Sequence, residues 1–174
     1  MLRHIVNQWY KNKDKLEKHI TENLKWYEEI TYLDLVKKVV DLILNDEEAE
    51  YNDETYNVDE ITEINNGDYQ GTLLYLIPTT IYQPDETQYL MTAVGYGSCE
   101  GCDTLQFVKS NISYGIDAEN WYGHSEYEKV EIKREVISDL MTLSLHLIQK
   151  MVKPYKDNFW DGDKYTEVEE MIND

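Results

Sequence analysis

Apolar residues follow a helical spacing in the first part of the chain. In the range 3–29 they recur every three to four positions among lysines and glutamates, which is typical of an amphipathic helix. A second such stretch, 33–45, follows Thr31 and Asp34, which have the spacing of a helix capping box. We therefore expect two helices before residue 46.

Strand-like runs occupy the middle of the chain. The two strongest, 72–77 and 88–96, predict an antiparallel hairpin, and 61–64 is a candidate for a short strand before them. Asn66-Gly67 predicts a turn between these strands, since both residues tolerate positive φ, and Gln83-Pro84-Asp85-Glu86 predicts another. One face of the last strand would carry Leu90, Thr92 and Val94, and the other Tyr89, Met91 and Ala93.

The clearest helix lies in the range 130–152 and carries two neighbouring apolar stripes. The first consists of Ile132, Val136, Leu140, Leu143 and Leu147, and the second of Ile137, Met141, Leu145, Ile148 and Met151. A helix with two apolar faces is expected to pack centrally, across the sheet. Before it, 103–111 fits a short helix or a strand, and the polar, aromatic range 111–127 is expected to be an irregular surface segment.

These elements predict one α+β domain over residues 1–174, with N-terminal helices, a small antiparallel sheet whose hairpin lies around 72–96, and a long C-terminal helix packed on the sheet. An acidic linker, 46–60, would join the helices to the sheet. An acidic tail, 157–174, would dock through Trp160 and Tyr165 or stay mobile.

The chain shows no leader pattern and no long apolar run, and two cysteines fit a reducing compartment, so we expect a soluble, cytoplasmic protein.

Charge is distributed very unevenly along the sequence. The net charge is -19, and the span from Val39 to Val108 holds fifteen Asp and Glu but no Lys or Arg. The remaining residues hold twenty acids and sixteen bases. Such a field repels nucleic acid and anionic lipid and attracts basic protein surfaces. Direct binding of nucleic acid or of a membrane is therefore not expected.

The range 46–60 is the most acidic part of this span. Its composition indicates a loop or a partly ordered segment, and it is either a solvated connector or a contact surface for a basic partner. Carboxylates interleaved with tyrosines can imitate nucleic acid, because they offer negative charge and rings that stack on arginine. The candidate partner-binding residues are Asp46, Glu47, Glu48, Glu50, Tyr51, Asp53, Glu54, Tyr56, Asp59 and Glu60.

Cys99 and Cys102 form a CxxC motif among glycines. The spacing suits half of a tetrahedral zinc site, which His124, Asp103, another histidine or a second subunit would have to complete. A redox dithiol is the second alternative, although the neighbouring carboxylates disfavour a thiolate. The third is that the cysteines are small residues of a tight turn without chemistry. We expect no bound cofactor, with zinc as the one exception.

Other catalytic motifs are absent from the sequence. It holds no P-loop, no nucleophile elbow and no dinucleotide fingerprint, and the four histidines lie far apart. His146 falls within the apolar C-terminal helix, where we expect a hydrogen-bonded core histidine. We therefore predict that the protein is not an enzyme.

Several short stretches resemble a family of small proteins encoded by phages and prophages of Gram-positive bacteria. The resemblance is carried mainly by Tyr96-Gly97-Ser98-Cys99-Glu100-Gly101-Cys102-Asp103-Thr104-Leu105, a YGSCxGCDTL motif. Shorter matches occur at 67–72, 82–84, 141–143 and 145–149. The resemblance as a whole extends over about half of the chain and brings no catalytic residue with it.

A phage origin implies a class of function. Small acidic phage proteins often inhibit host defence by covering nucleic-acid-binding sites, as anti-CRISPR and anti-restriction proteins do. The sequence therefore predicts a monomeric or homodimeric inhibitor of a basic host protein, such as a CRISPR effector or a restriction enzyme, acting in the host cytoplasm. The alternatives are a zinc- or thiol-dependent module centred on Cys99 and Cys102, and an accessory protein of the virion.

Overall fold

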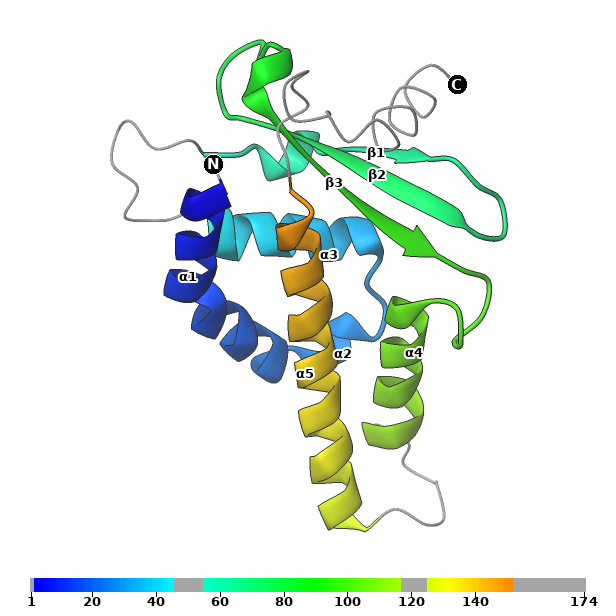
Figure 1. Cartoon of the computed structure of the whole chain (residues 1–174). Helices are drawn as coiled ribbons and strands as arrows, with labels where there is room; N and C mark the ends of the chain where they lie inside the picture. The colour runs from blue at the N-terminus through cyan, green and yellow to red at the C-terminus, as the bar shows by residue number, and fades with distance from the viewer. Residues whose placement is uncertain (1, 46–54, 117–124, 152–174) are drawn as a thin grey trace.

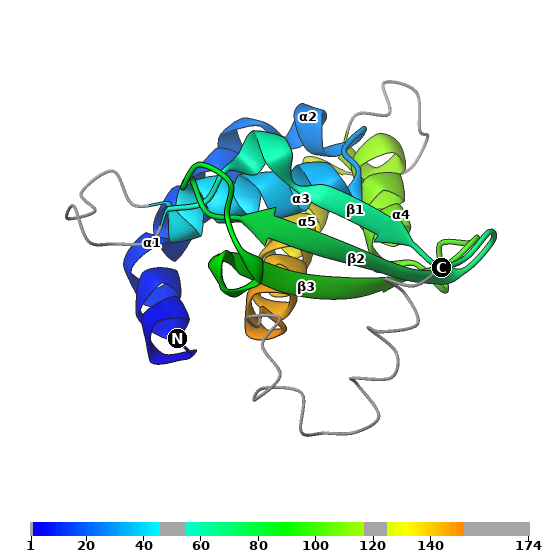
Figure 2. The same ribbon diagram turned by 90° about the horizontal axis from the view of Figure 1, so that it is seen from above.

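A three-stranded antiparallel sheet packs on a layer of helices, so the protein has the predicted α+β architecture (Figure 1). The computed structural model describes residues 2–45, 55–116 and 125–151. The sheet lies over α3 (Tyr32–Val39) and over the C-terminal end of α5 (Glu126–Gln149), and α1 and α4 lie on opposite sides of this pair (Figure 2). The predicted tail 157–174 falls outside the described residues.

The N-terminal helix is shorter than its periodicity predicts. It runs over α1 (Leu2–Glu22), and a separate turn, α2 (Leu24–Tyr27), follows it. Asn23 leaves the helical conformation with φ -127° and ψ 30°, and its side-chain amide donates to the His19 carbonyl at 2.8 Å. Asparagine competes with the helix for backbone hydrogen bonds in this way, which explains the break.

The second predicted helix begins at its capping box. The Thr31 side chain accepts the Asp34 N–H, and the Asp34 carboxylate accepts the Thr31 N–H, so α3 starts at Tyr32 as expected. The helix continues as a π-helical segment, η1 (Val40–Leu44). Asn12 of α1 donates to the Ile43 carbonyl at 3.0 Å, which ties α1 to this segment.

The sheet has the order β1-β2-β3, with β1 (Thr62–Asn65), β2 (Gly71–Pro78) and β3 (Tyr89–Tyr96). The predicted hairpin is therefore confirmed, and its register places Leu73 opposite Val94. The first turn differs in detail, because the loop 66–70 is longer than a two-residue turn and neither Asn66 nor Gly67 has positive φ. Among the described non-glycine residues, positive φ occurs at Gln83, between β2 and β3.

The two faces of the sheet have different neighbours. The inner face carries Leu73, Tyr75, Ile77, Leu90 and Val94, which join one large core with α1, α3, α4 and α5. The Thr92 hydroxyl, also on this face, donates to the Leu147 carbonyl of α5 at 2.8 Å. The outer face carries a smaller apolar cluster around Leu74 and Met91. The alternation predicted for the last strand is therefore confirmed.

The chain is helical from Thr104 to Ile116, after the turn that follows β3. The structure has α4 (Thr104–Ser110), so the choice between helix and strand at 103–111 is resolved in favour of helix. The chain continues as a second π-helical segment, η4 (Asn111–Ile116), where we expected irregular structure. Ile112 is buried there against the core, which explains why this stretch stays helical. Short 3-10 turns, η2 (Val58–Glu60) and η3 (Glu86–Gln88), precede β1 and β3.

Candidate functional site

The uneven charge of the sequence corresponds to the two layers of the fold. The sheet, its connecting loops and the CxxC turn lie within 55–103, a range without any Lys or Arg. The described lysines and arginines all belong to the helical layer, on α1 to α5 or at a helix end. The sheet layer is therefore uniformly acidic, and the helical layer is of mixed sign.

Within the sheet layer, the carboxylates lie around the sheet and not along its strands. The strands carry one acidic residue, Glu63 of the edge strand β1. Exposed Asp59 and Glu60 come directly before β1, and exposed Asp85 lies between β2 and β3. Because the strands are antiparallel, the start of β1, the end of β2 and the start of β3 meet at the same end of the sheet. Asp59, Glu60 and Asp85, which we call the acidic end, therefore share one end of the sheet.

Local hydrogen bonds keep the Asp85 carboxylate charged. It accepts the Thr87 hydroxyl at 2.6 Å and the Thr87 N–H at 2.8 Å, and these two bonds lower the pKa of Asp85 from its usual value. Hydrogen bonds to the charged form of a carboxyl group favour that form. Asp85 thus presents a negative charge in a fixed orientation as the N-cap of η3.

The predicted partner-binding set is only partly described. Residues 46–54, with Asp46, Glu47, Glu48, Glu50, Tyr51, Asp53 and Glu54, fall outside the described residues, whereas Asp59 and Glu60 are exposed. Tyr56 is a correction, because its side chain is 5% exposed and belongs to the core. Its backbone N–H donates to the Asn45 side chain at 2.7 Å, and its carbonyl accepts from the same amide at 2.8 Å. These bonds hold Tyr56 beside Thr79 at the end of β2, so its ring is not part of the surface.

Both cysteines are exposed and form no disulfide in a tight turn between β3 and α4. The Cys102 N–H donates to the Cys99 carbonyl at 2.9 Å, and the Cys102 Sγ lies 3.0 Å from the Cys99 nitrogen. A side-chain hydrogen bond with Cys99 raises the pKa of the Cys102 thiol, and the hydrogen bond from the Cys99 backbone N–H opposes this rise. A Cβ at Gly97 would lie 2.5 Å from the Cys102 Sγ, so glycine is required for this close approach.

Asp103, a possible third ligand of the proposed zinc site, is used within the fold. Its buried carboxylate accepts the Tyr32 hydroxyl at 3.0 Å, the Gln106 N–H at 3.0 Å and the Gly97 N–H at 3.3 Å. It thereby caps α4 and joins this helix to α3 and to the turn. Across the ranges that the structure describes, no three His, Cys, Asp or Glu side chains gather as a metal site would require. His124 lies outside these ranges, and His146 is exposed on α5 and is not the core histidine that we expected.

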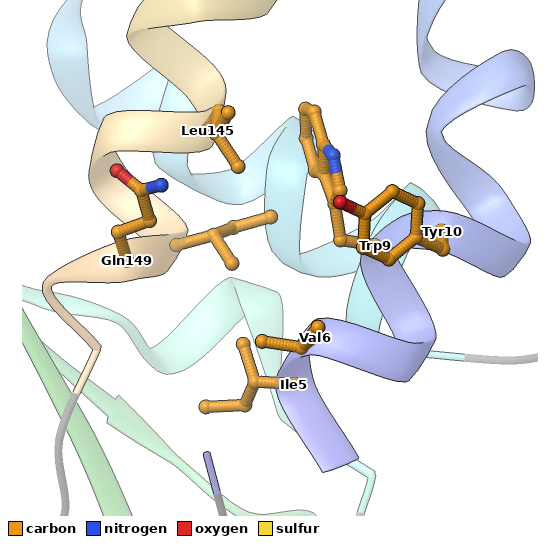
Figure 3. A pocket seen from close by; sticks show the side chains of 7 residues that line it. Ile5, Val6, Trp9, Tyr10, Leu145 and Gln149 are labelled. Carbon is orange, nitrogen blue, oxygen red and sulfur yellow. The ribbon is translucent and has the colours of Figure 1, made fainter. Parts of the chain in front are cut away.

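A groove between α1 and α5 was not predicted from the sequence (Figure 3). Its first part is an apolar hollow of about 310 Å³, into which Trp9 of α1 and Leu145 of α5 project. Val6 and Tyr10 line it and remain 44% and 70% exposed. The hollow is lined by Ile5, Val6, Trp9, Tyr10, Leu145, Ile148 and Gln149.

The groove continues past Trp9 into a wider hollow of about 550 Å³ with charged walls. This part is lined by Trp9, Lys13, Glu17, Val130, Lys133, Arg134, Ile137, Ser138 and Met141. Arg134 is paired with Glu131 at 2.7 Å, and the Lys13 ammonium lies 5.7 Å from the centroid of the Tyr10 ring. The sequence feature that could have indicated this groove is the second apolar stripe of the C-terminal helix. Its residues Ile137, Met141 and Leu145 are only half-buried in the structure.

Comparisons of the chain with protein-family models, with curated proteins and with solved structures found no match. The resemblance to phage proteins stays a prediction. Among the described helices, none has both the length and the apolar character that crossing a membrane requires.

Proposed function

We propose that the protein is a phage-encoded inhibitor that binds a basic, nucleic-acid-handling host protein through its acidic sheet layer. The observation that carries the proposal is the absence of Lys and Arg from 55–103, the range that forms the sheet and its loops. Asp59 and Glu60 of the acidic end are the described carboxylates of this layer closest in sequence to the acidic range 46–54, and Asp85 lies at the same end of the sheet. The CRISPR effectors and restriction enzymes of a bacterial host are partners of the required charge.

The physical basis is competition for a cationic site. A protein that binds nucleic acid presents lysines and arginines, and an opposing carboxylate surface accelerates association and gains charge-assisted hydrogen bonds. The two hydrogen bonds from Thr87 fix the orientation of the Asp85 carboxylate before a partner binds. This lowers the entropic cost of ordering that side chain on binding. Because the sheet layer carries no lysine or arginine, it makes no repulsive contact with the cations of the partner.

The test is displacement of DNA from purified CRISPR effector and restriction nucleases. We expect the full chain to reduce DNA binding and cleavage by at least one of these nucleases, with an apparent affinity that falls steeply as salt is raised, because salt screens exposed charges. Inhibition that does not change with salt would contradict a charge-based mechanism.

Neutral substitutions test whether inhibition depends on the carboxylates of the sheet layer or only on the net charge of the protein. The triple variant D59N/E60Q/D85N should weaken inhibition about tenfold, since contact charges set the rate of association. The matched triple variant D14N/E22Q/E135Q removes the same charge from α1 and α5 and should inhibit like the natural protein. If both triple variants lost the same amount of inhibition, the inhibition would depend on net charge and not on the carboxylates of the sheet layer.

The zinc- or thiol-dependent module remains the alternative, because two exposed thiols share one turn. Under the inhibitor proposal, the C99S/C102S variant should keep its DNA displacement. If the purified protein instead binds zinc stoichiometrically, and if the double substitution abolishes both the zinc and the inhibition, the alternative is favoured.

A further inference from the structure

We propose that the groove between α1 and α5 binds an amphipathic helix of a partner protein, with carboxylates on the partner helix beside Lys13 and Lys133. This interaction goes beyond the proposed inhibition, because it uses the helical layer and not the acidic sheet layer. The argument rests on the shape of the groove, on its apolar floor and on the charges at one end.

The groove has the dimensions of a helix-binding site. Its walls are two helices, and its lining on α5 extends from Val130 to Gln149, which is about 29 Å at 1.5 Å per residue. A helix of about 20 residues fits this length. Helices that dock in such grooves insert apolar side chains spaced by three to four residues, which is the spacing of the lining itself.

The floor of the groove offers apolar area that the fold leaves open. Val6, Tyr10 and Val130 are 44%, 70% and 55% exposed, and all three line the groove. Trp9 is common to both hollows and forms the floor where they meet. Trp9 itself is 8% exposed and belongs to the core, so the apolar contact area for a partner comes from Val6, Tyr10 and Val130 around it.

The charged end specifies the sign of the partner. Lys13, Lys133 and Arg134 line the wider hollow together with one carboxylate, Glu17. Glu131 already pairs with Arg134, so Lys13 and Lys133 are the cations that a partner carboxylate would meet. In a protein of net charge -19, this local excess of cations complements an acidic helix.

A second copy of the chain fits the groove less well. In a symmetric dimer the same surface meets itself, so the cations of one copy would find only the single carboxylate Glu17 on the other. An anionic membrane is also disfavoured, because the net charge of the molecule repels it.

The experiment measures binding of labelled peptides to the full chain by fluorescence anisotropy at low salt. The probe is a 20-residue helix, about the length of the groove, with leucine and phenylalanine on one face and glutamates on the other side of one half. Three such peptides with different apolar sequences are used, each with a scrambled control of the same composition. We expect at least one probe to bind about tenfold tighter than its scrambled control, because only the helix with a continuous apolar face fits the floor.

Variants of the protein locate the binding site. Val6→Glu places a charge on the apolar floor and Lys133→Glu reverses the charged end, and each should weaken binding about tenfold. Lys25→Glu makes the same charge change as Lys133→Glu at an exposed position of α2, outside the groove, and should change the affinity less than about twofold. Circular dichroism and thermal unfolding confirm that each variant is folded. Failure of all three probes to bind, or equal affinity for all three variants, would overturn the proposal.

Discussion

The Tyr75 hydroxyl is buried under the sheet and makes no hydrogen bond of normal geometry among the described residues. Tyr32 is also buried, but its hydroxyl donates to Asp103 at 3.0 Å and accepts the Leu105 N–H at 3.2 Å. A comparison of these two tyrosines therefore distinguishes the free-energy cost of a buried hydroxyl without a hydrogen bond from the stabilisation by a buried hydroxyl that has one.

Tyr75→Phe should leave the free energy of unfolding unchanged or raise it by about 1 kcal/mol, because an unsatisfied polar group is removed from the core. Tyr32→Phe should lower it by about 2 kcal/mol, because the buried Asp103 carboxylate loses a donor. Urea unfolding of both variants measures the difference. A larger loss for Tyr75→Phe than for Tyr32→Phe would contradict the hydrogen bonding described above.

Buried tyrosines also predict loss of stability in alkaline solution. Burial raises the pKa of Tyr27, of Tyr32 and of Tyr75 above the ordinary 10.0, and at Tyr75 the nearby Glu63 carboxylate raises it further. Above about pH 10 the unfolded chain releases these protons while the folded chain retains them, so the unfolded state is favoured as pH rises. Thermal unfolding followed from pH 8 to pH 11 should show a midpoint that falls above about pH 10, and Tyr75→Phe should make this fall shallower.

At the scale of elements, capping residues decide where helices begin. Ser125 accepts the Glu128 N–H and the Glu128 carboxylate accepts the Ser125 N–H, which closes a capping box at the start of α5. The sequence pattern placed the start of this helix near residue 130, because its first turns are polar and show no apolar stripe. The cap is therefore a local signal that periodicity misses.

Ser125→Ala should lower the free energy of unfolding by about 1 kcal/mol, because the first turn of α5 loses its side-chain acceptor. Ser138→Ala is the matched control, since Ser138 is exposed in the middle of the same helix, where alanine is the better helix former. Its effect should stay within about 0.5 kcal/mol. Chemical denaturation measures both, and equal effects would mean that the cap does not stabilise α5.

At the scale of the whole molecule, net charge acts on stability as well as on binding. A charge of -19 repels itself most in the compact state, so the folded protein is destabilised at low salt. Adding sodium chloride to about 0.3 M should raise the unfolding midpoint, because the screening length falls below about 10 Å. The D59N/E60Q/D85N variant should unfold at a higher temperature in low salt and gain less from added salt. A midpoint that falls as salt is added would contradict this account.

Particular residues show how far the sequence could predict the molecule. The capping box at Thr31 and the alternation of Leu90 and Met91 were readable, because each depends on neighbours within a few positions. The break at Asn23 and the burial of Tyr56 were not, because a competing hydrogen bond decides the first and a contact with Asn45 and Thr79 the second. The candidate surface was predicted as one acidic range, and the structure adds Asp85, which is distant in sequence but lies at the same end of the sheet.

The sequence by itself determined the α+β class, the strand pairing around 72–96 and the exclusion of basic residues from one continuous span. These properties follow from local periodicity and from composition, which need no knowledge of distant contacts. The tertiary structure alone decided that this span forms a separate layer, that Asp103 serves the fold, and that four of the five residues of the second apolar stripe line a groove with α1. Each of these depends on which distant elements pack together, because burial and charge at a surface are set by neighbours in space.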